Sequence, residues 1–371
     1  MSSVIDMDYM FFHAARFQRD ISKWDVSRMQ AMYGMFWGAK SFASDISKWD
    51  VSRVRNMANM FQGASSFDRD ISKWNVSSVK DMYSMFRAAK LFDRDIYNWV
   101  VSSVASMGGM FASATNFNSD IAKWDVSGIT DMGRVFSYTI LFSGDISTWN
   151  VSKVTNMGSV FAHASLFNSN ISEWDVSNVT DMTAMFQSAR AFNGDISKWD
   201  VSSVVTMSTM FRSTTSFNGY IWRWDVSRVV TMDSMCQDAT SFQQNLCGAA
   251  WVQSKARKSI MFEGSSGSIS AVVCTAFSPQ SKEELKSAVD TCFKLSPHGD
   301  CSNSLYGPMW EWGVSSVTDM SGMFSQPKFY STNAFNADIS QWDLSRVTTM
   351  LGIFEVRHHS TVTFLNGTYR E

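Results

Sequence analysis

Lysine and aspartate flank a tryptophan repeatedly along this chain, at intervals of 25 residues. In the segment Lys123-Trp124-Asp125 the two charged residues stand two positions apart, so an extended chain would place both on its exposed face. Such columns could bind a protein or a glycan, or they could neutralise each other and keep an open sheet soluble. The predicted binding residues are Lys23, Asp25, Lys48, Asp50, Lys73, Asn75, Lys123, Asp125, Asp175, Lys198, Asp200, Arg223 and Asp225.

A second acidic column precedes the isoleucine of most repeats. Carboxylates stacked at roughly 5 Å could hold calcium, which prefers oxygen ligands. Asn170 replaces the aspartate in one repeat, and either side chain can accept a hydrogen bond from a turn amide. We therefore favour the turn-capping role and predict no metal. The column comprises Asp20, Asp45, Asp70, Asp95, Asp120, Asp145, Asn170 and Asp195.

Arrangements of residues that would support catalysis are missing from the sequence. The histidines show no metal-ligand spacing and no nucleophile motif, and there is no glycine-rich phosphate loop. The recurring methionines and tryptophans are assigned to the core, and the serines are part of the repeat. We therefore predict a protein that is not an enzyme, with no catalytic residue and no cofactor. The five histidines are His13, His163, His298, His358 and His359.

Composition excludes some partners. The chain has 371 residues, of which 45% are apolar, and a formal charge of −2, so it lacks the basic excess typical of nucleic-acid binding. No apolar run reaches the ~18 residues of a membrane-spanning helix, and no signal peptide is visible at the start. The chain is therefore expected to be cytoplasmic or to have its secretion signal outside this sequence. Its oligomeric state cannot be deduced.

The elements that position these columns follow from one strict period. A spacing of 25 residues indicates small units that bury their apolar sides only by stacking, which is the pattern of a solenoid. The tryptophans that mark the period are Trp24, Trp49, Trp74, Trp99, Trp124, Trp149, Trp174, Trp199 and Trp224.

Two apolar spacings alternate within a unit. Trp124 and Val126 stand two apart and predict a short, half-exposed strand. The apolar stripe that follows has helical spacing and predicts a short helix. The expected fold is an α/β solenoid, leucine-rich-repeat-like, with short parallel strands on one face and short helices on the other. The stripe consists of Met132, Val135, Phe136, Thr139 and Phe142.

Residues with side-chain oxygens precede the first methionine of most units. Such residues accept the free N–H groups of a helix start, so they are predicted to be N-caps. Ala31 is an exception. The predicted caps are Asp6, Asn56, Asp81, Ser106, Asp131, Asn156, Asp181, Thr206 and Thr231.

The period divides the chain into four parts. Residues 1–246 hold ten units, and 247–308 form an array-closing and connecting segment with an amphipathic helix after Pro279. Residues 309–354 form a second short block with a five-residue insertion, and 355–371 form a tail.

Four of the five cysteines lie in the connecting segment. Cys292 and Cys301 suit a loop-closing disulfide, and Cys247 with Cys274 would tie the array end. The alternative is four free, buried thiols in a reducing compartment. Cys236 replaces a core phenylalanine and is expected to be buried.

The repeat M-F-x-x-A-x-x-F-N-x-D-I-S-x-W-D-V-S-x-V-T-x-M, almost unaltered in residues 185–207, resembles the BspA-like repeat, also called the mycoplasma-type surface lipoprotein repeat. The resemblance covers residues 4–246 and about 312–354. It implies a leucine-rich-repeat-like solenoid, secreted or on a cell surface, that serves adhesion or protein recognition. We expect a non-enzymatic recognition solenoid that binds a protein or glycan through its strand face. The alternative is a structural spacer or envelope component that acts by repeat length and self-association.

Overall fold

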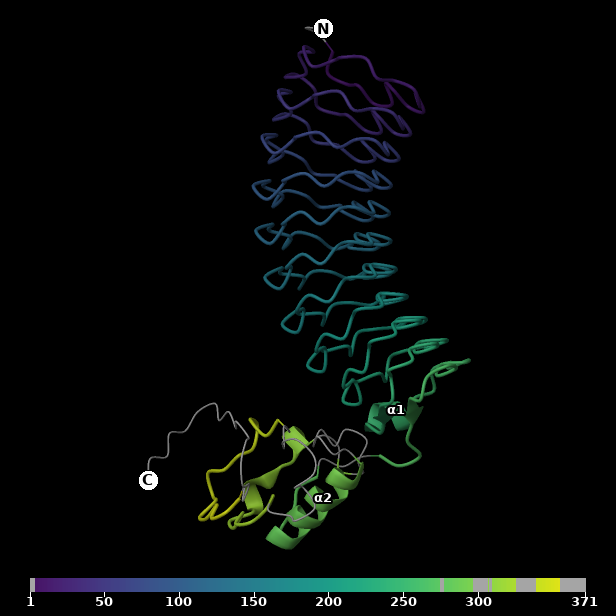
Figure 1. Cartoon of the computed structure of the whole chain (residues 1–371). Helices are drawn as coiled ribbons and strands as arrows, with labels where there is room; N and C mark the ends of the chain where they lie inside the picture. The colour runs from purple at the N-terminus through teal and green to yellow at the C-terminus, as the bar shows by residue number, and fades with distance from the viewer. Residues whose placement is uncertain (1–3, 274–276, 296–305, 307–308, 325–337, 354–371) are drawn as a thin grey trace. The chain divides into compact units, whose positions relative to one another are not determined.

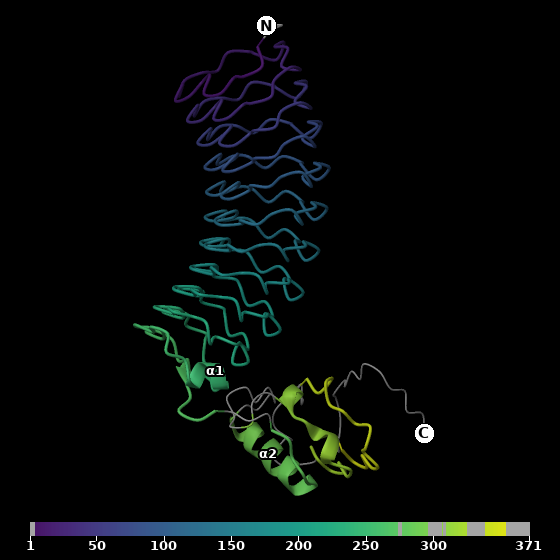
Figure 2. The same cartoon turned by 180° about the vertical axis from the view of Figure 1, so that it is seen from behind.

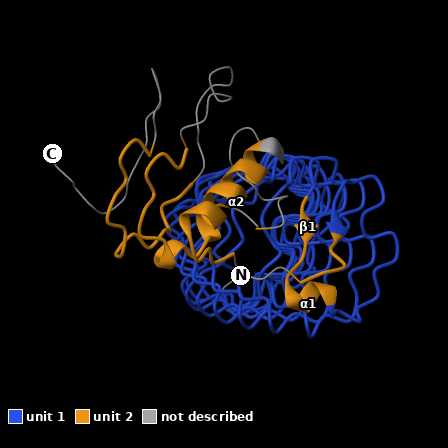
Figure 3. Cartoon of the chain, turned by 90° about the horizontal axis from the view of Figure 1, so that it is seen from below, with its two compact units in different colours: residues 1–243, 253–268 blue, residues 244–252, 269–371 orange. Residues whose placement is uncertain are grey.

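The computed structural model describes residues 4–273, 277–295, 306, 309–324 and 338–353. The chain divides into two compact units (Figure 3). The first contains residues 1–243 and 253–268, and the second contains residues 244–252 and 269–371.

Successive repeats of the first unit form coils that stack one on the next (Figures 1 and 2). Backbone hydrogen bonds join neighbouring coils: the N–H of Met57 donates to the Asp81 carbonyl at 3.0 Å, and that of Phe61 to the Met85 carbonyl at 2.9 Å. Asn56 and Asp81 also form a parallel bridge. A short parallel ladder therefore runs along the stack.

The strand and the helix predicted for each repeat are wrong for residues 4–243, where the described structure contains neither. Tight turns replace the helix, because the N–H of Val135 bonds to the Met132 carbonyl at 3.1 Å and that of Thr139 to the Phe136 carbonyl at 3.1 Å. Turns closed over three residues bring positions i and i+3 to the same side. Their apolar spacing therefore imitates that of a helix.

Left-handed backbone conformations prevent these turns from joining into a helix. Arg134 and Tyr138, within the segment predicted to be helical, have φ of 62° and 60°. The predicted strand is also closed into a turn, since the Trp124 N–H bonds to the Ile121 carbonyl at 3.1 Å. The parallel pairing between coils thus lies where the helices were expected.

The six aspartates and asparagines among the nine residues predicted as helix caps cap these turns instead. Asp131 Oδ1 accepts the N–H of Gly133 at 2.8 Å, and Asn156 Oδ1 accepts that of Gly158 at 2.8 Å. The predicted side-chain chemistry is right, although the capped element is different. The same bond to the N–H two residues later is made by Asp6, Asn56, Asp81 and Asp181.

Columns of like side chains form the core, as predicted. The rings of Phe86 and Phe111 lie 5.8 Å apart with planes 2° from parallel. Trp99 and Trp124 stack at 6.3 Å, and the indole Nε1 of Trp124 donates to the Ile96 carbonyl of the preceding coil at 3.0 Å. A stacked tryptophan such as Trp124 therefore contributes apolar burial and a hydrogen bond between coils.

One further coil follows the ten that the sequence indicates. Arg257 forms a parallel bridge with Thr231, and the Cys236 N–H donates to the Met261 carbonyl at 2.9 Å. Lys258 stands where other units have their first methionine, so the apolar pattern hides this coil. The stack thus includes residues that were assigned to the connecting segment.

The second unit contains most of the regular secondary structure. Its elements are β1 (Asn245–Leu246), α1 (Ala249–Val252), α2 (Lys282–Leu295) and two 3-10 helices, η1 (Met309–Glu311) and η2 (Val314–Ser316). The strand β2 (Ser268–Ile269) lies at the division between the units and pairs with β1. Among the described helices, none is both long and apolar enough to cross a membrane.

Helix α2 confirms the amphipathic helix predicted after Pro279. Ser281 Oγ accepts the N–H of Glu284 at 3.2 Å, and the Glu284 carboxylate accepts the N–H of Gln280 at 2.7 Å. These bonds satisfy donors at the helix start. The four residues predicted to share its apolar face are fully buried: Leu285, Ala288, Val289 and Cys292.

The second repeat block keeps the predicted 30-residue offset. Asp319 bridges Thr349, and the indole of Trp342 donates to the Met309 carbonyl at 2.7 Å. Trp342 also stacks on Trp312 at 6.5 Å. The predicted insertion and tail, like Cys274 and Cys301, fall outside the described residues.

Candidate recognition surfaces

All thirteen residues of the predicted charged columns are exposed. Lys123 lies over the ring of Tyr97, with Nζ 4.4 Å from the centroid, and Arg223 lies over Trp222. The tryptophan between the two columns, such as Trp124, is buried. The alternation predicted from the sequence is therefore present, although turns rather than strands produce it.

The aspartates of these columns have a structural task. Asp125 Oδ1 accepts the N–H of Ser127 at 3.1 Å, and Asn75 does the same for Ser77 at 3.2 Å. Hydrogen bonds from the serine lower the pKa of Asp125 below its ordinary value, because they stabilise the ionised carboxylate. One oxygen of each such carboxylate is therefore committed to its own turn.

The second acidic column also caps turns. Asp45 Oδ1 accepts the N–H of Ser47 at 2.9 Å, and Asn170 accepts that of Ser172 at 3.0 Å. The predicted hydrogen-bonding role toward turn amides is thus confirmed. Over the part of the chain that is described, no cluster of three or more histidine, cysteine or acidic side chains could hold a metal ion.

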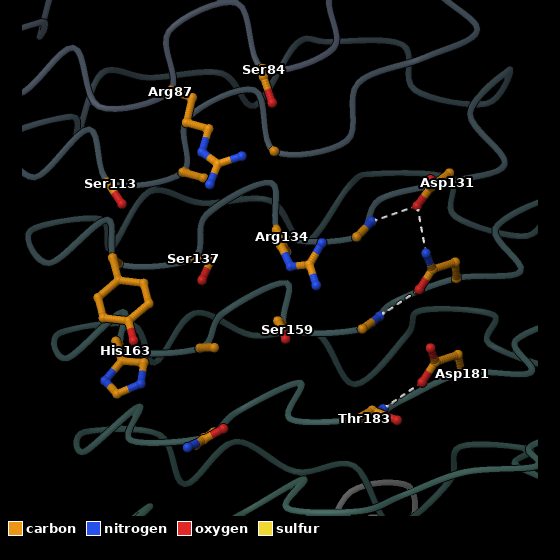
Figure 4. Close-up of a pocket in the computed structure, with 18 of the residues that line it drawn as sticks. Ser84, Arg87, Ser113, Asp131, Arg134, Ser137, Ser159, His163, Asp181 and Thr183 are labelled. Atoms are coloured by element: carbon orange, nitrogen blue, oxygen red, sulfur yellow. Dashed lines mark hydrogen bonds between the residues drawn. The ribbon is translucent and has the colours of Figure 1, made fainter. Parts of the chain in front are cut away.

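A hollow that the sequence analysis missed opens on the outer side of the turn segments, with a volume of about 510 Å³ (Figure 4). We call it the turn-face hollow. It forms where three consecutive units carry small residues both one and five positions after their first methionine. The small pairs are Gly108 with Ala112, Gly133 with Ser137 and Gly158 with Ala162, and the longer pairs Tyr83 with Arg87 and Thr183 with Gln187 border the hollow.

A ladder of polar groups forms one wall of the turn-face hollow. Asp131 Oδ1 accepts both the N–H of Gly133 at 2.8 Å and the side-chain amide of Asn156 at 2.9 Å. Asp181 Oδ1 accepts the N–H of Thr183 at 2.8 Å (Figure 4). These hydrogen bonds fix the orientation of the carboxylates and occupy the backbone N–H groups of Gly133 and Thr183.

Two guanidinium groups lie over the hollow without a partner among the described residues. Arg87 and Arg134 are exposed, and neither side chain forms an ion pair or hydrogen bond with any described residue. In Figure 4, Arg134 lies between the polar ladder and His163. Ser84, which also lines the hollow, is 1% exposed, and its hydroxyl has no hydrogen-bond partner within the described structure.

Aromatic rings form the opposite wall. Tyr138 and His163 stack with centroids 4.1 Å apart and planes 11° from parallel. Burial, and to a lesser degree the charge of Arg190, lowers the pKa of His163 below its ordinary value. The histidine is therefore neutral at physiological pH. An alignment of the repeat units could have revealed this site, because three consecutive units carry glycine directly after their first methionine and the other units do not. These glycines are Gly108, Gly133 and Gly158.

The three cysteines that the structure describes are in two states. Cys236 is free and buried, as predicted, and burial raises the pKa of its thiol. Cys247 and Cys292 are disulfide-bonded. The proposed partners Cys274 and Cys301 lie outside the described residues, so the pairing stays a prediction.

The stacked, hydrogen-bonded coils define a tandem-repeat protein. The family described as Mycoplasma protein of unknown function, DUF285, matches residues 5–123, 42–145, 111–202, 161–271 and 299–362. These overlapping matches cover most of the chain, and the protein belongs to this repeat-containing family. The comparison with curated proteins found no match.

Proposed function

We propose that this protein is a non-enzymatic recognition solenoid, secreted or displayed on a cell surface, that binds a protein or glycan through its charged columns. The resemblance of its repeat to BspA-like surface proteins supports the location. The disulfide-bonded Cys247 and Cys292 support it further, because disulfides persist in oxidising compartments.

The observation that carries the proposal is the column of exposed lysines, which form no ion pair with any described residue. Lys48, Lys73 and Lys123 are exposed, and none of them forms an ion pair within the described structure. The neighbouring aspartates, in contrast, spend one oxygen on their own turns. Lys48 and Lys73 are one repeat apart, and Lys123 follows two repeats later because Asn98 occupies the position between them. Ammonium groups without ion pairs among the described residues support binding of a partner that carries negative charge.

A pull-down from cell-surface extracts tests this proposal. The full-length protein is compared with a variant in which Lys48, Lys73 and Lys123 are all changed to Glu. The matched control changes three exposed lysines outside the columns to Glu, which alters the net charge by the same amount. These control residues are Lys40, Lys80 and Lys90.

Recognition through the columns predicts a partner that the native protein and the control capture and the column variant does not. Equal capture by all three folded proteins, or none by any, would refute the proposal and favour a structural spacer. Thiol counting by mass spectrometry on protein from its native source tests the location. Four blocked cysteines would support an oxidising compartment, and five free thiols would contradict it.

A further inference from the structure

We propose that the turn-face hollow is a binding site for an acidic saccharide, that is, a sugar carrying a carboxylate or sulfate group. This site goes beyond the function proposed above, because none of the thirteen charged-column residues lines it. The proposal therefore stands or falls independently of recognition through the columns.

The cationic side of the site indicates an anionic ligand group. Arg87 and Arg134 present planar donor forks that match the oxygen geometry of carboxylates and sulfates. The carboxylates of Asp131 and Asp181 share the hollow, yet each directs one oxygen to its own turn amide, and neither pairs with an arginine of the described segments. The two guanidinium groups thus remain available to a ligand.

The rest of the lining suits the hydroxyl groups of a sugar. Ser113, Ser137 and Ser159 contribute hydroxyls, and the second oxygens of Asp131 and Asp181 can accept hydrogen bonds. The volume of about 510 Å³ falls within the ~300–1,000 Å³ typical of small-ligand sites. The hollow therefore has room for a ligand held mainly by polar contacts.

A peptide fits this lining less well. Peptides that add a strand need free backbone donors, but the N–H groups of Gly133 and Thr183 bond to capping carboxylates. The N–H groups of Gly109 and Arg134 donate to the carbonyls of the next coil. With these four backbone donors already bonded, side chains supply the donors described for this site, which favours a saccharide over a peptide that adds a strand.

The site is also organised before any ligand arrives. The buried Ser84 hydroxyl lies over Gly109, where an added Cβ would come within 3.0 Å of its oxygen. A buried hydroxyl without an acceptor costs free energy unless a ligand or water accepts its hydrogen bond. Backbone hydrogen bonds between neighbouring coils, such as those from Gly109 and Arg134, fix the backbone that lines the hollow, so binding requires little rearrangement.

The test is a glycan array of sialylated, uronate-containing, sulfated and neutral glycans, probed with the full-length protein. We expect binding only to acidic glycans, and the carboxylate and sulfate arms identify the preferred group. The double variant R87Q/R134Q should lose at least tenfold in affinity. The matched control R212Q changes an arginine at the same repeat position as Arg87, five units away and outside the hollow, and should bind normally.

Two further variants separate binding from folding. Ala162→Gln places in the hollow a residue that other units carry at this position, Gln62 and Gln187, and should abolish binding with the fold intact. Arg134→Gly should reduce binding without lowering Tm, because Arg134 has a left-handed φ of 62° that glycine adopts freely.

Binding to no glycan, to neutral glycans alone, or equally by R87Q/R134Q and the native protein would overturn the proposal. Tighter binding to oligoglutamate than to every acidic glycan would also overturn it and would indicate a peptide ligand. Acidic glycans whose binding is lost in R87Q/R134Q should bind the column variant described above normally, which distinguishes failure of this site from failure of the columns.

Discussion

Replacement of Trp124 by alanine should destabilise the first unit far more than the same change at Trp24. Trp124 is 3% exposed, stacks on Trp99 at 6.3 Å, and donates its indole N–H to the Ile96 carbonyl. Trp24 occupies the same repeat position four units earlier, but its side chain is partly exposed. The same substitution, tryptophan to alanine, is therefore tested at a buried and at a partly exposed position.

The magnitudes follow from burial and hydrogen bonding. A fully buried tryptophan changed to alanine costs about 3–5 kcal/mol, and the partly exposed Trp24 should cost about 2 kcal/mol. Trp124→Phe keeps an aromatic ring but loses the indole donor. The Ile96 carbonyl still accepts the Trp99 N–H at 3.1 Å, so this change should cost only about 1–2 kcal/mol.

Urea denaturation and differential scanning fluorimetry measure these differences. For a unit of this size, Trp124→Ala should lower Tm by about 10 °C, since each kcal/mol corresponds to about 2–4 °C. A decrease in Tm for Trp24→Ala as large as that for Trp124→Ala would refute the argument from burial. Equal losses for the phenylalanine and alanine variants would refute the importance of packing.

The remaining predictions concern single side chains. Asp125→Asn should change the free energy of unfolding by less than about 0.5 kcal/mol, because Asn75 makes the same hydrogen bond in its own turn. Asp125→Ala should lower the free energy of unfolding by about 1 kcal/mol in urea titration. Equal effects of the two variants would contradict the turn-capping role. The pKa of His163 is lower in the folded state, so the unfolded chain takes up its proton first and stability falls as pH drops below about 6.5. The difference in Tm between the native protein and His163→Gln should therefore shrink from pH 8 to pH 5. A constant difference would disprove the burial of the imidazole. Cys236 should react with a thiol reagent only after denaturation, because it is fully buried and its pKa is raised; rapid labelling of the native protein at this residue would show that the stack opens.

The sequence predicts the core better than the local backbone. The period of the tryptophans indicates which side chains stack, and the burial of Cys236 and the apolar face of α2 follow from the same patterns. The spacing of Met132, Val135 and Phe136 could not distinguish a helix from consecutive turns, because both bring residues three apart to one side. Only the left-handed backbone at Arg134 decides between them.

The turn-face hollow escaped prediction for a different reason. It forms because long side chains are absent at two positions in three adjacent units, and an absent side chain leaves no motif in the sequence. Arg87 and Arg134 are 47 residues apart and occupy different positions in their repeats. Only the stacking of coils shows that both belong to one site.

The tryptophan hydrogen bonds suggest how arrays of this kind could change in length. In the first unit, the indole of one coil reaches the isoleucine carbonyl 28 residues earlier, as Trp124 does with Ile96. Duplication or removal of one complete 25-residue segment would give every indole an equivalent acceptor, whereas a partial segment would leave donors and carbonyls without partners in the core. Genetic recombination between repeats could thus lengthen or shorten the protein in whole units, and could bring different outer residues together without rebuilding the interior.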